Sequence, residues 1–170
     1  KSKQGTNIRC YPGECEVTDT IGTNLTNCKY VFHTVGPDTR RKENTKSWNE
    51  STLRSCYENC LEKMLKYNVK SIAFCCISTG IYDYDNQEAA KIAIETTKSW
   101  LENNHQSVEN VTFCIWDSND YGHYIKLLDQ YFQQQQVIDQ SPKISTTIKP
   151  DVIVPSIMSE NSIGHVPSTN

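Results

Sequence analysis

The stretch Ser71-Ile-Ala-Phe-Cys-Cys-Ile-Ser-Thr-Gly-Ile-Tyr82 decides the fold class of this 170-residue chain. Its first seven residues form a short, largely apolar run that is partly β-branched. Such a run is typical of a strand buried on both faces of a parallel sheet. Residues 87–101 follow with apolar side chains at helical spacing. The order of strand, small-residue loop and helix therefore predicts one βα unit of an α/β protein.

The loop at residues 77–82 lies where open α/β sheets bind their ligands, between the carboxyl end of a strand and the start of a helix. Backbone N–H groups are unpaired at such a position, and the helix dipole favours negative charge. Gly80 would also let the chain approach a phosphate closely. Ser-Thr-Gly occurs in ordinary turns between a strand and a helix as well, so the loop alone leaves both interpretations open.

The rest of the chain repeats the alternation of strand and helix. Strands are predicted at 14–18, 29–35, 71–77 and 111–116, and amphipathic helices at 51–67, 87–103 and 121–132. This order implies parallel pairing with right-handed crossovers. We therefore predict an α/β fold, a three-layer α/β/α sandwich around a mostly parallel mixed sheet. At least three strands, at 30–35, 72–77 and 111–116, should be parallel and carry helices on both faces.

The pattern stops at the glutamine run 133–136. Residues 137–170 are rich in Ser, Thr, Pro and Ile, and they contain four prolines but no usable period. This composition predicts a disordered polar tail over 133–170, so the folded domain is expected at 1–132. The one apolar island, at 148–158, is interpreted as part of a spacer, with a short binding motif as the alternative.

Charge and hydropathy exclude several classes of protein. The net charge is −3 and the isoelectric point is near 5.8, which argues against broad binding of nucleic acid. The run Arg40-Arg41-Lys42 is interpreted as a solvated loop and not as a phosphate clamp. The longest apolar runs are about seven residues, too short to span a membrane, and no signal-peptide pattern opens the chain.

The eight cysteines do not form a metal-binding pattern. None of them has the Cys-x-x-Cys spacing of a zinc or redox site. Several fall on predicted core faces, where free cysteine behaves as a small hydrophobe. We therefore predict a reduced intracellular protein, in cytoplasm, nucleus or mitochondrion, without a metal or cofactor. The Asn-x-Ser/Thr triplets at Asn24, Asn49 and Asn110 alone suggest secretion, and chance explains them in an Asn-rich chain.

Four further motifs surround the 77–82 loop at a specific spacing. They are Cys10-Tyr-Pro-Gly-Glu-Cys-Glu-Val-Thr18, Cys28-Lys-Tyr-Val-Phe-His-Thr-Val-Gly-Pro37, Leu53-Arg-Ser-Cys-Tyr57 and Glu88-Ala-Ala90. Together with the loop they resemble the macro domain family, and most closely its MacroD-type branch. The resemblance covers roughly residues 5–132, and it implies the three-layer macro domain fold.

Two motifs of that family have no counterpart in the sequence. They are an Asn-Ala-Ala-Asn motif and a glycine-rich run ending in Val-Asp-Gly-Ala-Ile-His, both of which lie upstream in the family. The chain begins with Lys1 and not with Met. We therefore expect an internal fragment, a partial macro domain without its N-terminal strands. The catalytic aspartate of the family corresponds to no position here, so the catalytic residues are unknown.

The resemblance implies an ADP-ribose site at the ends of two strands. Ser78, Thr79, Gly80, Ile81 and Tyr82 match the loop whose backbone N–H groups cradle the diphosphate. Tyr82 corresponds to the aromatic residue beside the distal ribose, with a role as a lid on the core as the alternative. Trp116 matches the position that stacks on adenine, although strand-end aromatics also cap cores.

One residue departs from the family pattern inside this site. Asp83 stands where relatives carry glycine, beside the expected diphosphate. A carboxylate within ~6 Å of a pyrophosphate repels it. A residue other than glycine is also restricted there if φ is positive. The change puts both affinity and turnover in doubt.

Two functions follow from the resemblance. The first is a hydrolase that removes ADP-ribose from modified proteins or deacetylates O-acetyl-ADP-ribose. The second is a non-catalytic ADP-ribose reader, which the Asp83 change favours. The expected partner is ADP-ribose or a mono-ADP-ribosylated protein, and the protein is expected to be a monomer. A cysteine hydrolase using Cys76 and His33 lacks an orienting acid, and we interpret His33 as structural.

Overall fold

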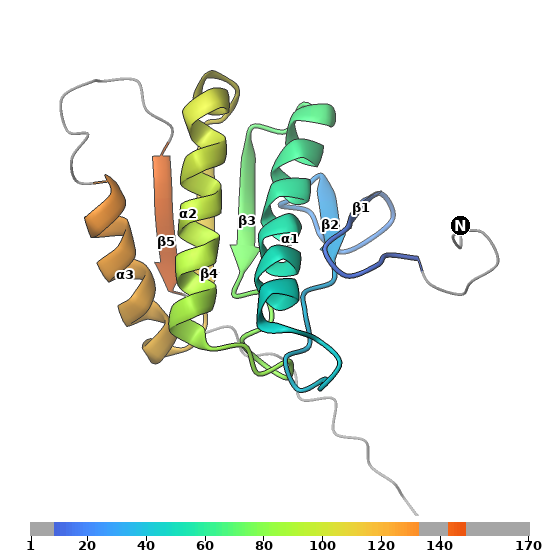
Figure 1. Cartoon of the computed structure of the whole chain (residues 1–170). Coiled ribbons are helices and arrows are strands. Elements are labelled where there is room, and N and C mark those ends of the chain that lie inside the picture. The colour runs from blue at the N-terminus through green and yellow to red at the C-terminus, as the bar shows by residue number, and fades with distance from the viewer. Residues whose placement is uncertain (1–8, 133–142, 149–170) are drawn as a thin grey trace, which may run out of the picture.

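The computed structural model describes residues 9–132 and 143–148 (Figure 1). These residues form three α-helices, one short 3-10 helix and five strands. In chain order they are β1 (Cys15–Asp19), β2 (Tyr30–Thr34), α1 (Lys46–Lys66), β3 (Ser71–Cys75), α2 (Asn86–Asn104), the 3-10 helix His105–Ser107, β4 (Asn110–Ile115), α3 (Ser118–Phe132) and β5 (Lys143–Ile148). The predicted helices and strands are all present.

The α/β fold predicted from the sequence, with both parallel and antiparallel strand pairs, is confirmed. β3 pairs with β4 and β4 pairs with β5, both in parallel, whereas β1 and β2 form a separate antiparallel pair. The prediction that residues 30–35 pair in parallel was wrong, because β2 bonds to β1. The connection between them, residues 20–29, contains no helix, and strands joined without a crossover helix pair antiparallel.

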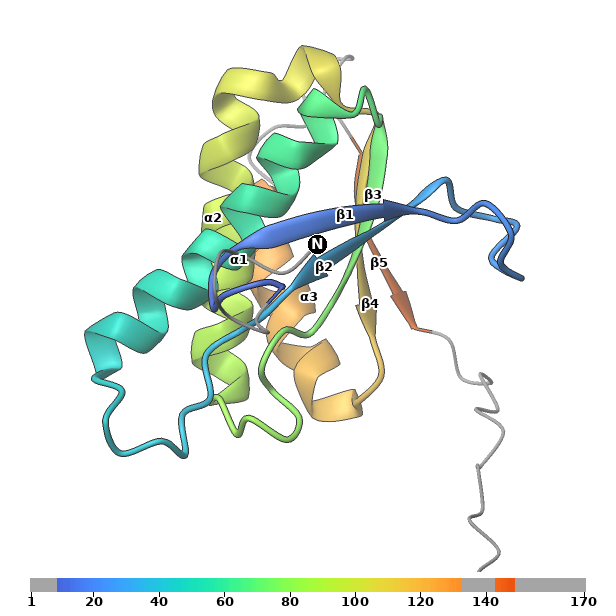
Figure 2. The same cartoon turned by 90° about the vertical axis from the view of Figure 1, so that its right-hand side faces the viewer.

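The three α-helices lie side by side on one face of the sheet (Figure 2). Their contact with the sheet buries Phe74 of β3 and Phe113 of β4. On the opposite face, Ala73 and Cys75 of β3 are exposed. The expected burial of this strand on both faces was therefore wrong within the described residues, because those residues provide no helix to cover that side.

Aromatic rings join the helices to β3 and β4. The ring of Tyr57 from α1 lies 5.1 Å from that of Phe74, and Phe74 stacks on Phe113 at 6.0 Å. Tyr124 from α3 lies 5.2 Å from Phe113. The i, i+3, i+4 spacing predicted for α1 is confirmed, because its core face is buried at Leu53, Cys56, Tyr57, Cys60, Leu61 and Met64.

Helix α1 begins earlier than predicted. The helix was predicted to start at residue 51, but its cap is Thr45, whose Oγ1 accepts a hydrogen bond from the backbone N–H of Trp48 at 3.1 Å. Hydrophobic spacing alone does not show that the helix includes the charged residues before residue 51. Lys46, in the first turn, pairs with Glu88 of α2 at 2.7 Å.

The predicted disordered tail is wrong at one place. Lys143–Ile148 forms β5, which pairs with all six residues of β4. The segment Lys-Ile-Ser-Thr-Thr-Ile is rich in β-branched residues, which favour strands. The prediction relied on the absence of a period and overlooked this preference. The other residues of 133–170, including most of the apolar island, lie outside the described part of the chain.

Candidate functional site

The predicted site residues lie at one edge of the parallel sheet. Ser78, Thr79, Gly80, Ile81 and Tyr82 follow β3, and Trp116 directly follows β4. β3 and β4 are parallel and in register, with Cys75 opposite Cys114. Their carboxyl ends therefore meet at the same edge, which is where open α/β sheets bind ligands.

Large apolar side chains are exposed at this edge. Ile81 is 81% exposed and Trp116 is 71% exposed, while Tyr82 is about half as accessible as either. Trp116 is therefore not a lid on the core, because a core lid would be buried. An exposed indole at a strand end is suited to stacking on a planar base.

Two hydrogen bonds close the 78–82 loop. The N–H of Asp83 donates to the carbonyl of Gly80, and the N–H of Tyr84 donates to the carbonyl of Ser78, both at 3.0 Å. Ser78 and Asp83 both have positive φ, at 68° and 56°. Asp83 thus occupies a backbone conformation that glycine adopts more readily, as the departure from the family pattern suggested.

Gly80 is needed neither for the conformation of the loop nor for its packing. Its φ lies outside the left-handed region, and a Cβ built on it would meet no atom within 4 Å. The space in front of this residue is open. The glycine leaves room at the surface of the loop, so a ligand can reach the backbone there.

The connection between β2 and α1 is fastened to the loop. Thr39 donates from its N–H to the carbonyl of Tyr82 at 3.0 Å, and its hydroxyl lies 2.8 Å from the carbonyls of Tyr82 and Asp83, to either of which it can donate. Gly36 packs so closely on Ser78 that an added Cβ would overlap the Ser78 hydroxyl. No local sequence pattern points to Gly36 or Thr39, because each contacts a segment more than forty residues away.

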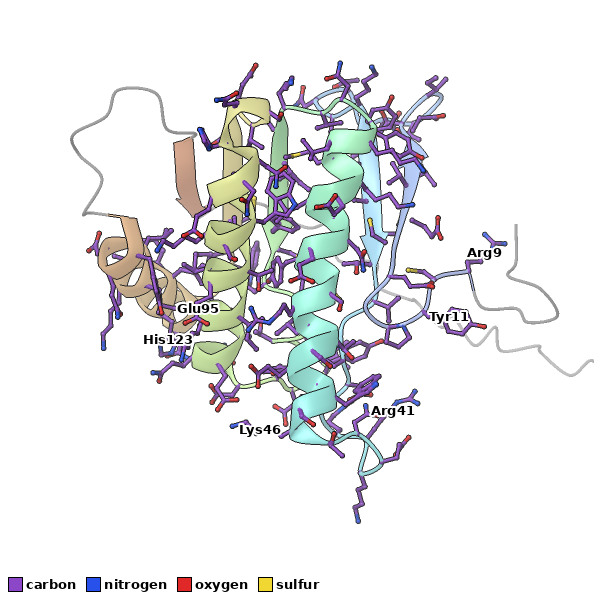
Figure 3. The ribbon with its side chains drawn as sticks, turned by 45° about the horizontal axis from the view of Figure 1, so that its top comes forward. Arg9, Tyr11, Arg41, Lys46, Glu95 and His123 are labelled. Atoms are coloured by element: carbon purple, nitrogen blue, oxygen red, sulfur yellow. The ribbon has the colours of Figure 1, made fainter. Side chains whose placement is uncertain are left out.

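Arg40 lies beside the loop but is not a free cation. Its guanidinium donates to both carboxylate oxygens of Asp38, at 2.8 and 2.9 Å, and it sits 6.0 Å from the Tyr82 ring. The Arg40 guanidinium holds the pKa of Asp38 down at about 2. Arg41 contacts the same carboxylate at 3.7 Å. Figure 3 shows Arg41 and Lys46 at this end of the molecule.

Cys76 and His33 are not brought together as a catalytic pair. The ring of His33 hydrogen-bonds Thr18 Oγ1 at 2.9 Å on the β1–β2 pair. Burial, and after it the Asp120 carboxylate, raises the pKa of Cys76 to about 12. Such a thiol remains protonated at neutral pH and is a poor nucleophile. The contact with Thr18 fits the structural role expected for His33.

Two further features of the described residues bear on function. These residues contain no group of three or more His, Cys, Asp or Glu side chains arranged to hold a metal ion. Within the same residues, no helix combines the length and the apolar character needed to cross a membrane. The features that bear directly on function are the α/β fold and the 78–82 loop.

Comparison with known proteins agrees with this geometry. The family model described as Macro domain matches residues 1–93 of the 170. The ADP-ribose glycohydrolase MACROD2 of Mus musculus is 40% identical over 123 residues, which are 72% of this chain and 25% of that protein.

Solved structures give the same result. The macro domain of ganglioside induced differentiation associated protein 2 has a TM-score of 0.65 at 34% identity, covering 72% of this chain and 58% of that one. The Trypanosoma brucei macrodomain in complex with ADP-ribose has a TM-score of 0.61 at 35% identity, covering 70% and 47%. The chain thus spans a quarter of the mouse relative and about half of these solved domains. Because the family model covers more than half of its residues, the chain belongs to the macro domain family.

Proposed function

We propose that this chain is an ADP-ribose-binding module, and that the protein it represents removes ADP-ribose from modified proteins or deacetylates O-acetyl-ADP-ribose. The observation that supports the proposal most strongly is that the 78–82 loop after β3 and Trp116 after β4 follow two parallel strands paired in register, at one carboxyl edge of the sheet. Relatives with this family's fold include an ADP-ribose glycohydrolase and a macrodomain in complex with ADP-ribose.

The proposed binding mode assigns one part of the ligand to each segment. Backbone N–H groups of Ser78, Thr79, Gly80 and Ile81 would cradle the diphosphate, because successive free N–H groups form an anion site. Trp116 would stack on the adenine ring, which its exposure allows. Tyr82 would pack beside the distal ribose. Thr39 Oγ1 contacts its backbone carbonyl, and the Arg40 guanidinium lies over its ring.

The catalytic step would need a group outside the motifs of this chain. Hydrolysis requires a water molecule positioned near the anomeric carbon and a carboxylate or other base within reach of it. The family motif that carries the catalytic aspartate matches no stretch of the printed sequence. Hydrolase activity is therefore proposed for the protein and not for this stretch alone, and the catalytic residues are unassigned.

A non-catalytic reader is the second candidate function, and Asp83 favours it. This carboxylate stands at the end of the loop, where it would oppose a bound diphosphate. A reader that also contacts the modified protein outside this loop tolerates a weaker hold on the diphosphate. The protein would then mark ADP-ribosylated targets as a monomer, in the cytoplasm or the nucleus.

Calorimetric titration with ADP-ribose and a turnover assay separate these candidates. Both should be run on the product of the complete reading frame, with a mono-ADP-ribosylated protein as substrate. Binding together with release of ADP-ribose supports the hydrolase, and binding without release supports the reader. Failure to bind ADP-ribose at millimolar concentration would refute both.

A further inference from the structure

Asp120 is a buried carboxylate that no motif pointed to. It lies in the first turn of α3 and is 4% exposed. A charged group is costly to remove from water unless hydrogen bonds or partners replace its hydration. The free backbone N–H groups of the first helical turn favour negative charge at this position. The site therefore needs polar partners for Asp120, and the structure supplies them.

Those partners come from two other segments. Asp120 Oδ1 accepts a hydrogen bond from Asn86 Nδ2, in the first turn of α2, at 2.7 Å. Asp120 Oδ2 accepts from Thr79 Oγ1, inside the 78–82 loop, at 3.4 Å. One carboxylate thus connects the loop after β3, the start of α2 and the start of α3.

Asp120 is itself held firmly in place. Tyr124, one turn further along α3, is buried, and its ring packs on Phe113 of β4. At the other end of α3, Tyr131 Oη donates to Glu95 Oε1 of α2 at 2.6 Å. Figure 3 shows Glu95 where α2 and α3 face each other. The helix is fastened at two points, so its first turn offers the loop a rigid support.

The 78–82 loop needs such a support. Ser78 has a φ of 68°, a conformation that serine adopts only where surrounding contacts hold it. The two backbone hydrogen bonds to the carbonyls of Ser78 and Gly80 fix the loop along its own chain. Thr79 lies between them, and its hydroxyl lies within hydrogen-bonding distance of the carbonyl of Cys76 and of Asp120. The contact with Asp120 ties Thr79 to α3, whereas Thr39 holds the far end of the loop at Tyr82 and Asp83.

We propose that Asp120 is a positioning residue, whose hydrogen bonds to Thr79 and Asn86 set the direction of the N–H groups that would cradle a diphosphate. The inference rests on the proposed ADP-ribose binding. Anion recognition by backbone groups is sensitive to small displacements, because several N–H groups must point at one centre. Asp120 is too buried to act as a direct ligand and acts through the loop.

Two substitutions separate position from charge. In the product of the complete reading frame, Asp120→Ala removes both acceptors and should weaken ADP-ribose binding about tenfold. Asp120→Asn keeps an acceptor for Asn86 and can donate to Thr79 Oγ1, so it should stay within about threefold of the parent. Adenosine, which has no diphosphate, should bind both variants within about twofold of the parent.

A core substitution controls for lost stability. Met64 is fully buried in α1, and Met64→Ala should destabilise the fold without touching the loop. It should leave ADP-ribose affinity unchanged at temperatures where the protein stays folded. The double variant Asp120→Ala with Asn86→Ala should bind like Asp120→Ala alone, because both remove the same contact. Equal losses of affinity in Asp120→Ala and Met64→Ala would overturn the inference.

Hydrogen exchange of the loop amides tests the same idea without a ligand. Asp120→Ala should accelerate exchange at Asp83 and Tyr84, whose N–H groups donate to the loop carbonyls, by roughly tenfold or more, whereas Met64→Ala should not do so selectively. Unchanged affinity and unchanged exchange in Asp120→Ala would refute the positioning role even if the protein binds ADP-ribose. Faster exchange in a protein that does not bind ADP-ribose would support the positioning role and refute the proposed function.

Discussion

At the scale of the residue, Asp83 combines two unfavourable features at one position. Its φ of 56° suits glycine, and its charge directly follows the loop proposed to hold the diphosphate. Arg40 lies close to Asp83. Asp38 has the larger effect in raising the pKa of the Arg40 guanidinium, and the Asp83 carboxylate raises this pKa further. The repulsion of a ligand by Asp83 is therefore partly offset, and its removal should have a moderate effect.

Asp83→Gly should strengthen ADP-ribose binding about fivefold, as expected for one partly screened like-charge contact. Asp83→Asn keeps the restricted backbone and removes the charge, so it measures the electrostatic part alone. Asn68→Gly is the matched control, because Asn68 also has positive φ, at 51°, but lies at the end of α1. Calorimetric titration should give unchanged affinity for Asn68→Gly. Equal affinity in all three variants and the parent would contradict a diphosphate beside residue 83.

Gly80 is expected to matter for the ligand and not for the fold. Gly80→Val places a β-branched side chain in the open space where the diphosphate would lie, so ADP-ribose binding should be lost. Strain from positive φ is not the reason, because Gly80 does not have one. Thermal unfolding should shift by less than about 2 °C. A variant that still binds ADP-ribose would show that residues 78–82 are an ordinary turn.

Gly36, unlike Gly80, is expected to matter for the stability of the fold, because it is closely packed. A Cβ there would meet Ile77 Cγ2 at 2.7 Å and overlap the Ser78 hydroxyl, so Gly36→Ala should lower the free energy of unfolding by ~1–3 kcal/mol. Gly122→Ala is the control, since a Cβ there meets nothing and α3 should gain ~0.5–1 kcal/mol. Urea unfolding of both variants measures the difference. A stabilised Gly36→Ala would show that the segment after β2 does not approach the loop this closely.

The sequence could propose the loop residues and Trp116 as candidates because each directly follows a strand that its own local pattern predicts. It could not identify Gly36, Thr39 or Asp120, since their contacts with the loop span about forty residues. No local pattern encodes such pairs. Each of the three is a common turn or helix-start residue, and only the folded chain reveals what it touches.

At the scale of the element, strands and helices with clear hydrophobic spacing were predictable. Leu53 and Tyr57 on α1 and Phe74 on β3 are buried as their spacing predicts. The strand Lys143–Ile148 was not predictable. Its six residues are of mixed polarity and show no hydrophobic period, so a preference for β structure is their only signal. Pairing depends on a partner edge, here that of β4, which the sequence of the strand itself does not contain.

The boundary of the folded domain should therefore move from residue 132 to about residue 148. A chain ending at residue 132 leaves the outer edge of β4 without its partner and should unfold at least ~2 kcal/mol more easily than a chain ending at residue 148. A chain ending at residue 170 should match the one ending at 148. Urea unfolding of the three lengths measures this. Equal stability of the 132 and 148 chains would return β5 to the tail.

At the scale of the whole molecule, the exposed face of the sheet limits what this stretch can do alone. Cys75 and Cys114, paired in register, are exposed on the side away from the helices, and so is Ala73. A few hundred Å² of exposed apolar surface at ~25 cal/mol per Å² amounts to several kcal/mol. That is comparable to the whole stability of a small domain.

The 170-residue chain should accordingly show no measurable removal of ADP-ribose from a mono-ADP-ribosylated protein, and at best weak affinity for ADP-ribose. The reason is chemical as well as energetic, because no residue of the printed sequence matches the motif that carries the family's catalytic aspartate. Release of ADP-ribose, followed by chromatography, measures turnover. The product of the complete reading frame serves as the comparison. Turnover by the 170-residue chain itself would mean that the base lies among the residues printed here, and Asp83 would be the first to substitute, because it lies at the end of the loop.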